Sequence, residues 1–201
     1  TEAEYQKIWK YYFDLELDYG KIIAEIDKND TFLKEAAEYG SGIRILNQEL
    51  WEMIISYIIS QNNNIPRIKK GIEAVCDRYK AVICKDEQEN LEKTENEIYG
   101  FPHLADIEKN GGRQSLSELG LGYRDEYIWL MCEYEHENKV FFENLRKCDY
   151  EQSMKMLMEH KGIGRKVANC ISLFGLHHLD ACPIDVWMKK IIDEEYGGIQ
   201  P

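Results

Sequence analysis

The feature that most constrains the fold is a Gly-Ile-Gly turn between two stretches with helical periodicity. Residues 149–160 repeat apolar side chains at helical spacing and open with Asp149, a suitable N-cap residue. Gly162 is a natural residue to end that helix, and Gly164 lets the chain enter the next helix, over about residues 165–174, at once. The sequence therefore predicts a helix-hairpin-helix, whose turn presents backbone N–H groups suited to a phosphate oxygen.

Two residues around the second helix have chemical potential. Lys166 lies at the start of this helix, where the helix dipole and Arg165 favour loss of its proton, and only the neutral amine is a nucleophile. Asp185 follows a proline and precedes another apolar-periodic helix. Its carboxylate could take a proton from the lysine or stabilise positive charge on a sugar, and it could equally be a helix N-cap.

An asparagine run breaks the most apolar helix of the sequence, predicted over Gln48–Ser60 with Asn47 as its cap. The run, Asn62 to Asn64, is either an ordinary cap between helices or a polar loop that reads base edges. Arg67, just beyond it, is a further candidate for pairing with an exposed base. Pro66 fits the first turn of the next helix.

A second glycine turn covers Leu119–Arg124, and a short helix capped by Ser115 and Glu118 is expected before it. Tyr123 follows a glycine directly, so its ring either protrudes as a wedge for a base stack or packs at the start of a helix. The residues leave both alternatives open.

Four blocks of this sequence resemble one family of proteins. KVANC and PIDVWM, with SQNNNIPRI and LGLGYR, are similar to the helix-hairpin-helix/GPD superfamily of DNA glycosylases, above all to its 8-oxoguanine DNA glycosylase branch. The likeness runs from about Thr31 to Tyr196. Lys161 departs from the pattern, because the family usually has proline before the hairpin glycine.

The resemblance implies a base-excision-repair enzyme that acts on double-stranded damaged DNA and flips the damaged nucleotide out of the helix. Such an enzyme removes 8-oxoguanine opposite cytosine through a lysine Schiff base and then cuts the strand by β-elimination. By residue-level likeness, each site residue receives a role: Lys166 as nucleophile, Asp185 as its electrostatic partner, Asn62, Arg67 and Arg124 as readers of the orphaned cytosine, Tyr123 as wedge, Cys170 in the base pocket, and Gly162, Ile163, Gly164 and Val167 on the DNA backbone. The resemblance also implies a monovalent cation on the hairpin carbonyls; no other cofactor is expected.

We expect an all-α fold of two helical subdomains with the active cleft between them. Residues 48–184 would form a bundle carrying the hairpin, at about residues 150–176, while residues 1–47 and 185–201 would form the second subdomain. We also expect the chain to be a fragment of a longer protein. The family's N-terminal antiparallel β domain and C-terminal helix, which complete the lesion pocket, are not visible in the sequence.

The formal charge of −12 excludes a generically basic nucleic-acid binder, so any DNA contact has to be local. Acidic residues crowd Lys85–Glu97, an expected exposed connector, whereas basic residues cluster beside the asparagine run and at the hairpin. A small basic footprint of this kind predicts weak non-specific binding with strong salt dependence.

Several other features are expected to be unremarkable for function. The six cysteines show no metal spacing and would be free thiols in a reducing compartment, with no iron–sulfur cluster encoded in these residues. The pair His177-His178 would lie in a solvated loop, and the apolar faces of the N-terminal helices would be packed, around Trp9 in one and around Ile22 and Ile23 in the other. No apolar run is long enough for a membrane span. We expect a monomeric intracellular protein, cytoplasmic or nuclear.

Two other functions remain open at this level. One is an oxidised-pyrimidine lyase resembling endonuclease III, against which the NNNIPR and GYR blocks argue. The other is a non-catalytic helix-hairpin-helix module that only grips DNA, in which Lys166 and Asp185 would affect binding but not turnover.

Overall fold

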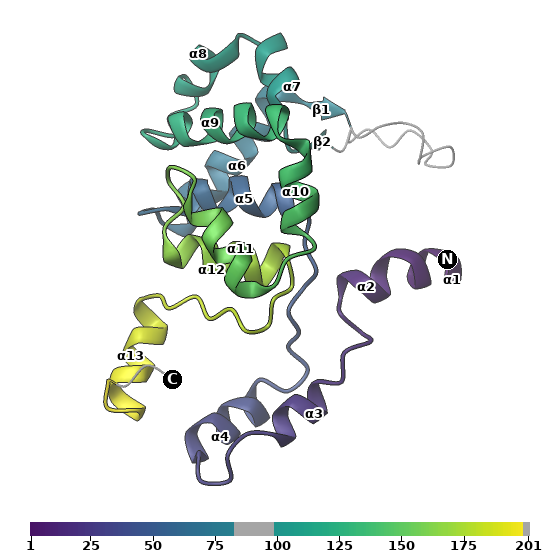
Figure 1. The fold of residues 1–201 in the computed structure, drawn as a ribbon, viewed down its shortest axis with the longest axis vertical. Helices are drawn as coiled ribbons and strands as arrows, with labels where there is room; N and C mark the ends of the chain where they lie inside the picture. Colours follow the sequence, from purple (N-terminus) through teal and green to yellow (C-terminus); the bar gives the residue numbers. More distant parts are fainter. Residues whose placement is uncertain (83–98, 199–201) are drawn as a thin grey trace.

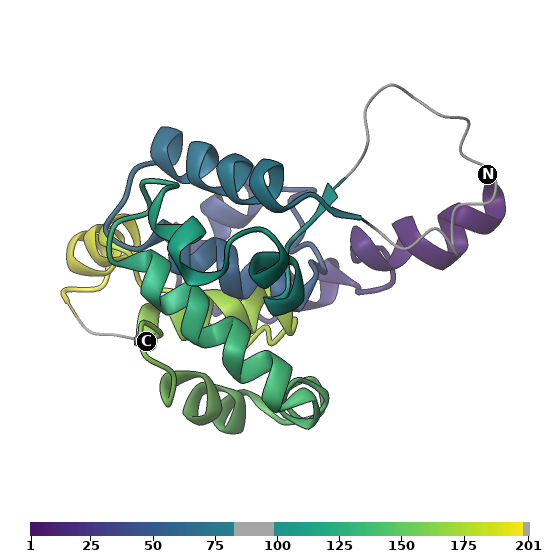
Figure 2. The same ribbon diagram turned by 90° about the horizontal axis from the view of Figure 1, so that it is seen from above.

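Helix α5 (Leu50–Ser60) lies at the centre of the fold, because its sequence is apolar on nearly every face. The computed structural model describes residues 1–82 and 99–198. Figures 1 and 2 show α5 to α12 gathered into one bundle, with α3, α4 and α13 beneath it in Figure 1. The bundle's other helices are α6 (Ile65–Tyr79), α7 (Leu104–Lys109), α8 (Gly112–Ser117), α9 (Arg124–Glu137), α10 (Lys139–Leu145), α11 (Tyr150–Met158) and α12 (Arg165–Gly175). Outside it lie α1 (Glu2–Glu4), the π-helical η1 (Tyr5–Trp9), α2 (Lys10–Tyr12), α3 (Tyr19–Ala24), α4 (Thr31–Tyr39) and α13 (Val186–Glu195).

The predicted all-α class is confirmed. In the described part of the chain, the strands are only β1 (Ala81–Val82) and β2 (Tyr99–Gly100), an antiparallel pair in which Ala81 faces Gly100. The acidic stretch predicted as a connector, Lys85–Glu97, lies outside the described residues. No described helix has the length and apolar character needed to cross a membrane.

The hydrophobic core belongs to the bundle. Leu50, Ile54 and Ile58 of α5 are completely buried, and so are Leu157 of α11 and Ile171 of α12. Burial of such side chains stabilises a fold by about 1.5–3 kcal/mol each. Both helices of the hairpin therefore contribute completely buried side chains to the core, which fixes the position of the hairpin.

The N-terminal helices differ from the expectation of packed apolar faces. Tyr5, Ile8 and Trp9 are 40%, 48% and 41% exposed, and Ile22 and Ile23 of α3 are 44% and 43% exposed. In both views the α1–α2 run stands apart from the bundle. Apolar periodicity predicted these helices correctly, but it does not reveal what their apolar faces contact.

Two predicted helix starts are wrong. Helix α5 begins at Leu50, where the Glu49 side chain accepts from the N–H of Glu52, while the predicted cap Asn47 instead donates to the Tyr11 carbonyl. Helix α8 begins at Gly112, so Ser115 lies inside it, buried and hydrogen-bonded to Tyr79 at 2.6 Å. In both cases the side chain predicted to cap a helix instead makes a hydrogen bond to a residue distant in the sequence.

The last helix contacts the N-terminal segment. The Tyr196 hydroxyl, just after α13, donates to the Asp30 carboxylate at 2.9 and 3.2 Å. Its ring meets Phe32 edge-on, with centroids 6.2 Å apart. The chain between α12 and α13 therefore spans from the bundle to this second group of helices.

Candidate functional site

The hairpin between α11 and α12 depends on one of its two glycines. Gly162 has a positive φ of 90°, and a Cβ there would lie 2.4 Å from Cδ2 of Tyr127. Gly164, by contrast, has an ordinary φ of −86° as the N-cap of α12, and a Cβ there would meet nothing within 4 Å. The predicted turn is confirmed, but only Gly162 needs to be glycine for backbone and space.

Lys166 lies on the exposed first turn of α12, as predicted. In the described part of the chain its side chain makes no ion pair or hydrogen bond, and the first-turn N–H groups of Arg165, Lys166 and Val167 have no acceptor. Ile163 and Val167 have buried side chains, so a DNA contact of theirs would come from the backbone. The hairpin thus presents a free amine beside a set of free N–H groups.

Asp185 caps α13, as its alternative reading predicted. Its Oδ1 accepts from the N–H groups of Trp187 and Met188 at 3.0 and 2.9 Å. The other carboxylate oxygen has no hydrogen bond within the described residues. A carboxylate held by two N–H groups is fixed in direction, with one oxygen left for other contacts.

A thiol connects the lysine and the carboxylate electrostatically. Cys170 is 5% exposed, and burial raises the pKa of its thiol, with the Lys166 ammonium opposing the shift and Asp185 adding to it. Tyr57 on α5 interacts electrostatically with this thiol, and burial raises the pKa of the Tyr57 hydroxyl as well. The charges of Lys166 and Asp185 therefore both act on the Cys170 thiol.

Tyr57 is a site residue that sequence reasoning assigned only to the core. Its ring stacks on Phe174 with centroids 6.1 Å apart, and its hydroxyl interacts electrostatically with the thiol of Cys170. The sequence could have indicated this role, because Tyr57 is a phenol among the aliphatic residues of α5 and a buried hydroxyl needs a hydrogen-bond partner. Cys170 is also more enclosed than expected, since the six residues from Val167 to Ser172 are all buried.

The asparagine loop and the second glycine turn are joined in one cluster. The Asn62 amide donates to the Tyr123 hydroxyl at 3.1 Å, and Arg124 donates to the carbonyls of Gln61, Asn62 and Leu121. Asn64 accepts from the N–H of Arg67, so the last asparagine is the N-cap of α6. The cap reading is confirmed for Asn64, and the turn brings Asn62, Tyr123 and Arg124 together.

Tyr123 both packs and protrudes. It is 45% exposed, the Arg124 guanidinium lies 4.7 Å from its ring centroid, and its ring meets Tyr127 edge-on at 5.5 Å. Tyr127 is also the ring that closes against Gly162. Packing therefore links the asparagine loop through two tyrosines to the hairpin.

Positive charge is available on both parts of this surface. The side chains of Arg67, Lys69 and Lys70 are exposed at the start of α6, and those of Arg165 and Lys166 at the hairpin. Lys161 is held by Glu126 at 3.0 Å. Among the described residues, Arg67, Arg165 and Lys166 form no ion pair, which leaves them free to meet an anion.

An open hollow lies elsewhere on the described structure, away from the hairpin. Its volume is about 420 Å³, and it lies between the start of α4 and the end of α13. Asp27, Asp30 and Glu195 line it, so its field repels phosphate. We therefore assign no nucleic-acid contact to it.

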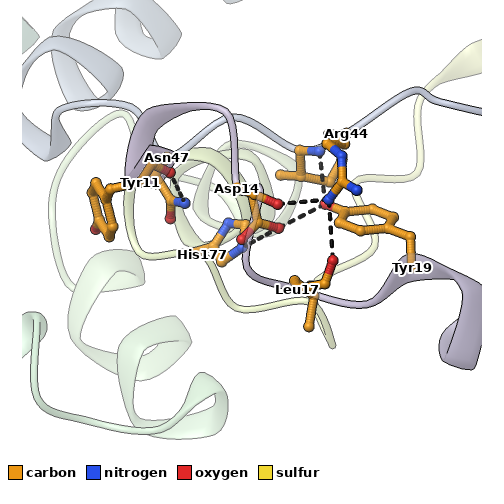
Figure 3. A network of polar contacts seen from close by, with 8 residues as sticks. Tyr11, Asp14, Leu17, Tyr19, Arg44, Asn47 and His177 are labelled. Carbon is orange, nitrogen blue, oxygen red and sulfur yellow. Dashed lines mark hydrogen bonds and ion pairs between the residues drawn. The ribbon is translucent and has the colours of Figure 1, made fainter. Parts of the chain in front are cut away.

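The loop after α12 is tied to the N-terminal segment rather than solvated. His177 Nε2 lies 3.1 Å from the Asp14 carboxylate, which also accepts from the Tyr19 hydroxyl at 2.9 Å. Arg44 donates to the backbone carbonyls of Asp14 and Leu17 (Figure 3). The expectation of a solvated His177-His178 loop is wrong, because His177 lies against the Asp14 carboxylate, which is only 9% exposed.

His160, the residue before Lys161, should make the stability of the folded protein depend on pH. Its ring lies between Tyr134 and Phe141, with centroids at 4.3 and 5.0 Å. Burial lowers the pKa of this imidazole, and Glu159 opposes the shift. The folded protein therefore keeps the ring neutral at pH values at which the unfolded chain binds a proton.

We expect the free energy of unfolding to fall as the pH drops through the ordinary histidine pKa of about 6.5, because the unfolded state then binds more protons. His160→Phe keeps the aromatic packing and removes this proton, so its stability should depend less on pH. Urea unfolding on both sides of that pKa measures the difference. An unchanged pH dependence of stability in the variant would contradict this role. Some pH dependence should remain in His160→Phe, because burial also lowers the pKa of His178.

The cysteines should differ in reactivity. Cys182 is exposed, whereas burial raises the pKa of the thiols of Cys132 and Cys170. Since only the thiolate reacts, iodoacetamide at neutral pH should label Cys182 first and the two buried thiols only after unfolding. Peptide mass spectrometry of the native protein checks this, and rapid labelling of Cys170 would contradict an enclosed thiol.

Comparisons with known proteins agree with this geometry. Residues 1–54 match the family model for the N-terminal domain of 8-oxoguanine DNA glycosylase. The chain is 33% identical over 167 residues to an N-glycosylase/DNA lyase of Saccharomyces cerevisiae, covering 77% of this chain and 42% of that protein. It is 28% identical to the N-glycosylase/DNA lyase OGG1 of Arabidopsis thaliana, covering 90% of this chain and 48% of that protein. The chain thus spans less than half the length of these two curated relatives.

Solved structures match over the whole chain. The apo form of the 8-oxoguanine glycosylase/lyase of Clostridium acetobutylicum superposes with a TM-score of 0.84 at 32% identity, covering 100% of this chain and 67% of that one. The same enzyme in complex with double-stranded DNA containing cytosine opposite 8-oxoguanine gives a TM-score of 0.83 at 32% identity, covering 100% of this chain and 65% of that one. The sequence blocks placed the start of the likeness at Thr31, which is too late, because the family model already matches from residue 1.

Proposed function

Because the chain belongs to the 8-oxoguanine DNA glycosylase family, we propose that it is a DNA glycosylase and abasic-site lyase that removes 8-oxoguanine opposite cytosine from duplex DNA. The observation that carries the proposal is that Lys166 and Asp185 both act electrostatically on the buried thiol of Cys170, with the amine exposed on the first turn of α12. We assign to these residues the roles of nucleophile, fixed carboxylate and pocket wall. The names of the relatives favour this activity over an oxidised-pyrimidine lyase or a non-catalytic module.

The chemistry follows from these positions. The neutral amine of Lys166 attacks C1′ of the flipped nucleotide, and the bond from C1′ to the base breaks, its electron pair leaving with the base. Asp185 stabilises the positive charge that develops on the sugar through the oxygen that the helix cap leaves free. Opening of the sugar gives a Schiff base on Lys166. Loss of a proton from C2′ then expels the 3′ phosphate, which cuts the strand.

The remaining roles are assigned to the second cluster. Asn62 and Arg67 would pair with the orphaned cytosine, and Tyr123, partly exposed and braced by Tyr127, would fill the gap in the stack. The guanidinium N–H groups of Arg124 donate to the carbonyls of Leu121 and Asn62. Arg124 would therefore orient the asparagine loop, and it would contact the cytosine only after one of these hydrogen bonds breaks. Backbone N–H groups around Gly164 would hold a phosphate of the bent strand.

Two further assignments complete the proposal. A monovalent cation would bind the hairpin carbonyls; that of His160 accepts one hydrogen bond, from the N–H of Ile163, and keeps a second lone pair for it. The protein would act as an intracellular monomer, since a single chain carries both clusters.

Borohydride trapping tests the proposal. The protein is incubated with duplexes that carry 8-oxoguanine opposite cytosine, an abasic site, or thymine glycol, with undamaged duplex as control. We expect covalent adducts on the first two duplexes only. Adducts on thymine glycol alone would favour the oxidised-pyrimidine activity, and binding without any adduct would contradict catalysis.

A further inference from the structure

Asn169 follows Lys166 and precedes Asp185, the two residues proposed to be catalytic, in the sequence. It is buried, at 5% exposure, one turn after Lys166 on α12. Its side-chain oxygen accepts from the backbone N–H of Cys182 at 3.2 Å and from the Tyr150 hydroxyl at 2.8 Å, and its amide nitrogen donates to the Arg165 carbonyl at 3.0 Å. The orientation of this amide is fixed, because a backbone N–H can only donate and a carbonyl can only accept.

From this geometry we propose that Asn169 is a positioning residue that sets the distance between Lys166 and Asp185. The inference rests on the proposed lyase function and deepens it. Asn169 is three residues after Lys166, and Cys182 is three residues before Asp185. One hydrogen bond therefore joins the turn that carries the amine to the segment that leads to the carboxylate.

The bond to Cys182 is the last one before Asp185. In the described part of the chain, residues 182–184 make no other hydrogen bond, and the next anchor is the cap of α13 itself. Pro183 follows at once and restricts the backbone, so a fixed Cys182 determines where Asp185 begins α13. Without this bond, α13 could shift away from the hairpin together with its cap.

The packing of the helices does not depend on the same amide. Ser153 of α11 and Ser172 of α12 form a separate buried hydrogen bond at 3.2 Å. Ile171 and Leu157, completely buried, hold the same two helices in the core. Loss of the Asn169 amide should therefore release the segment before Asp185 and leave the hairpin in place.

The test measures adduct formation under single-turnover conditions on an abasic-site duplex at saturating protein, with the DNA dissociation constant measured separately. We expect Asn169→Leu and Asn169→Ala each to slow the step by about 100-fold, the scale expected for misplacement of a reacting group. The dissociation constant should not change, because Asn169 is buried and touches no DNA. Asn169→Ala decides the question if the leucine does not fit beside the Tyr150 hydroxyl.

Tyr150→Phe is the matched control, since it removes one bond to the same oxygen but keeps the link to Cys182. We expect this variant to react at the wild-type rate. Wild-type rates in both Asn169 variants, or an equal loss in Tyr150→Phe, would overturn the positioning role alone. No adduct with the unaltered protein would overturn the proposed function, and the inference with it.

Discussion

Lys166→Gln is expected to abolish the borohydride-trapped adduct on duplexes with 8-oxoguanine or an abasic site. Glutamine has nearly the same length, but its amide nitrogen cannot form a Schiff base, so the covalent route is closed. Strand cleavage should fall by at least about a thousandfold, the scale of losing a catalytic nucleophile. Gel analysis of trapped complexes and of cleaved strands measures both.

Lys161→Gln is the control for charge. Lys161 is exposed on the same hairpin and pairs with Glu126, so this variant loses one positive charge from the same surface. It should weaken DNA binding slightly and still form the adduct. An adduct that persists in Lys166→Gln would mean that another amine is the nucleophile. Equal losses in both variants would point to charge alone and favour the DNA-gripping module.

The sequence predicted the local parts of this site well. Glycine turns, helix caps and the place of Lys166 depend on neighbours in the chain. The structure places Asp149 at a helix N-terminus as predicted, and it places Asn64 and Asp185 there as one of their two alternatives did. Such features are set by backbone dihedrals and by hydrogen bonds over three residues, which periodicity and residue type reveal.

What the sequence could not show are the partners distant in the chain. His177 meets Asp14, Asn47 bonds to Tyr11 rather than capping α5, and Asn169 meets Cys182. Each contact depends on how two helices pack, and a side chain offers the same donors and acceptors to any partner. Asn169 did carry a signal, because a polar residue inside an apolar helical stripe needs a buried partner.

Among substitutions that add one methyl group at the hairpin, Gly162→Ala is expected to lower the free energy of unfolding the most. The added Cβ would lie 2.4, 2.7 and 3.0 Å from three carbons of the Tyr127 ring, and the backbone φ of 90° strains any residue with a side chain. Strain of about 1–3 kcal/mol and overpacking of about 1–3 kcal/mol add to a loss near 4 kcal/mol. Urea unfolding measures this loss.

The effect on activity should exceed the effect on stability, because the clash falls on the ring that links both clusters. Tyr127 closes against Gly162 on one side and braces Tyr123 on the other, so relief of the clash would move the hairpin or the tyrosine turn. Adduct formation at temperatures where the variant is folded should therefore still be impaired.

Gly164→Ala provides the comparison two residues away. Its φ is ordinary and its Cβ would meet nothing within 4 Å, so its unfolding free energy should stay within about 1 kcal/mol of the unaltered protein. Equal destabilisation by both alanines would mean that the loss of stability comes from the conformational preference of alanine at the turn and not from contact with Tyr127. Adding Tyr127→Ala to Gly162→Ala separates the two causes: it removes the ring clash but not the φ strain, so part of the loss should remain.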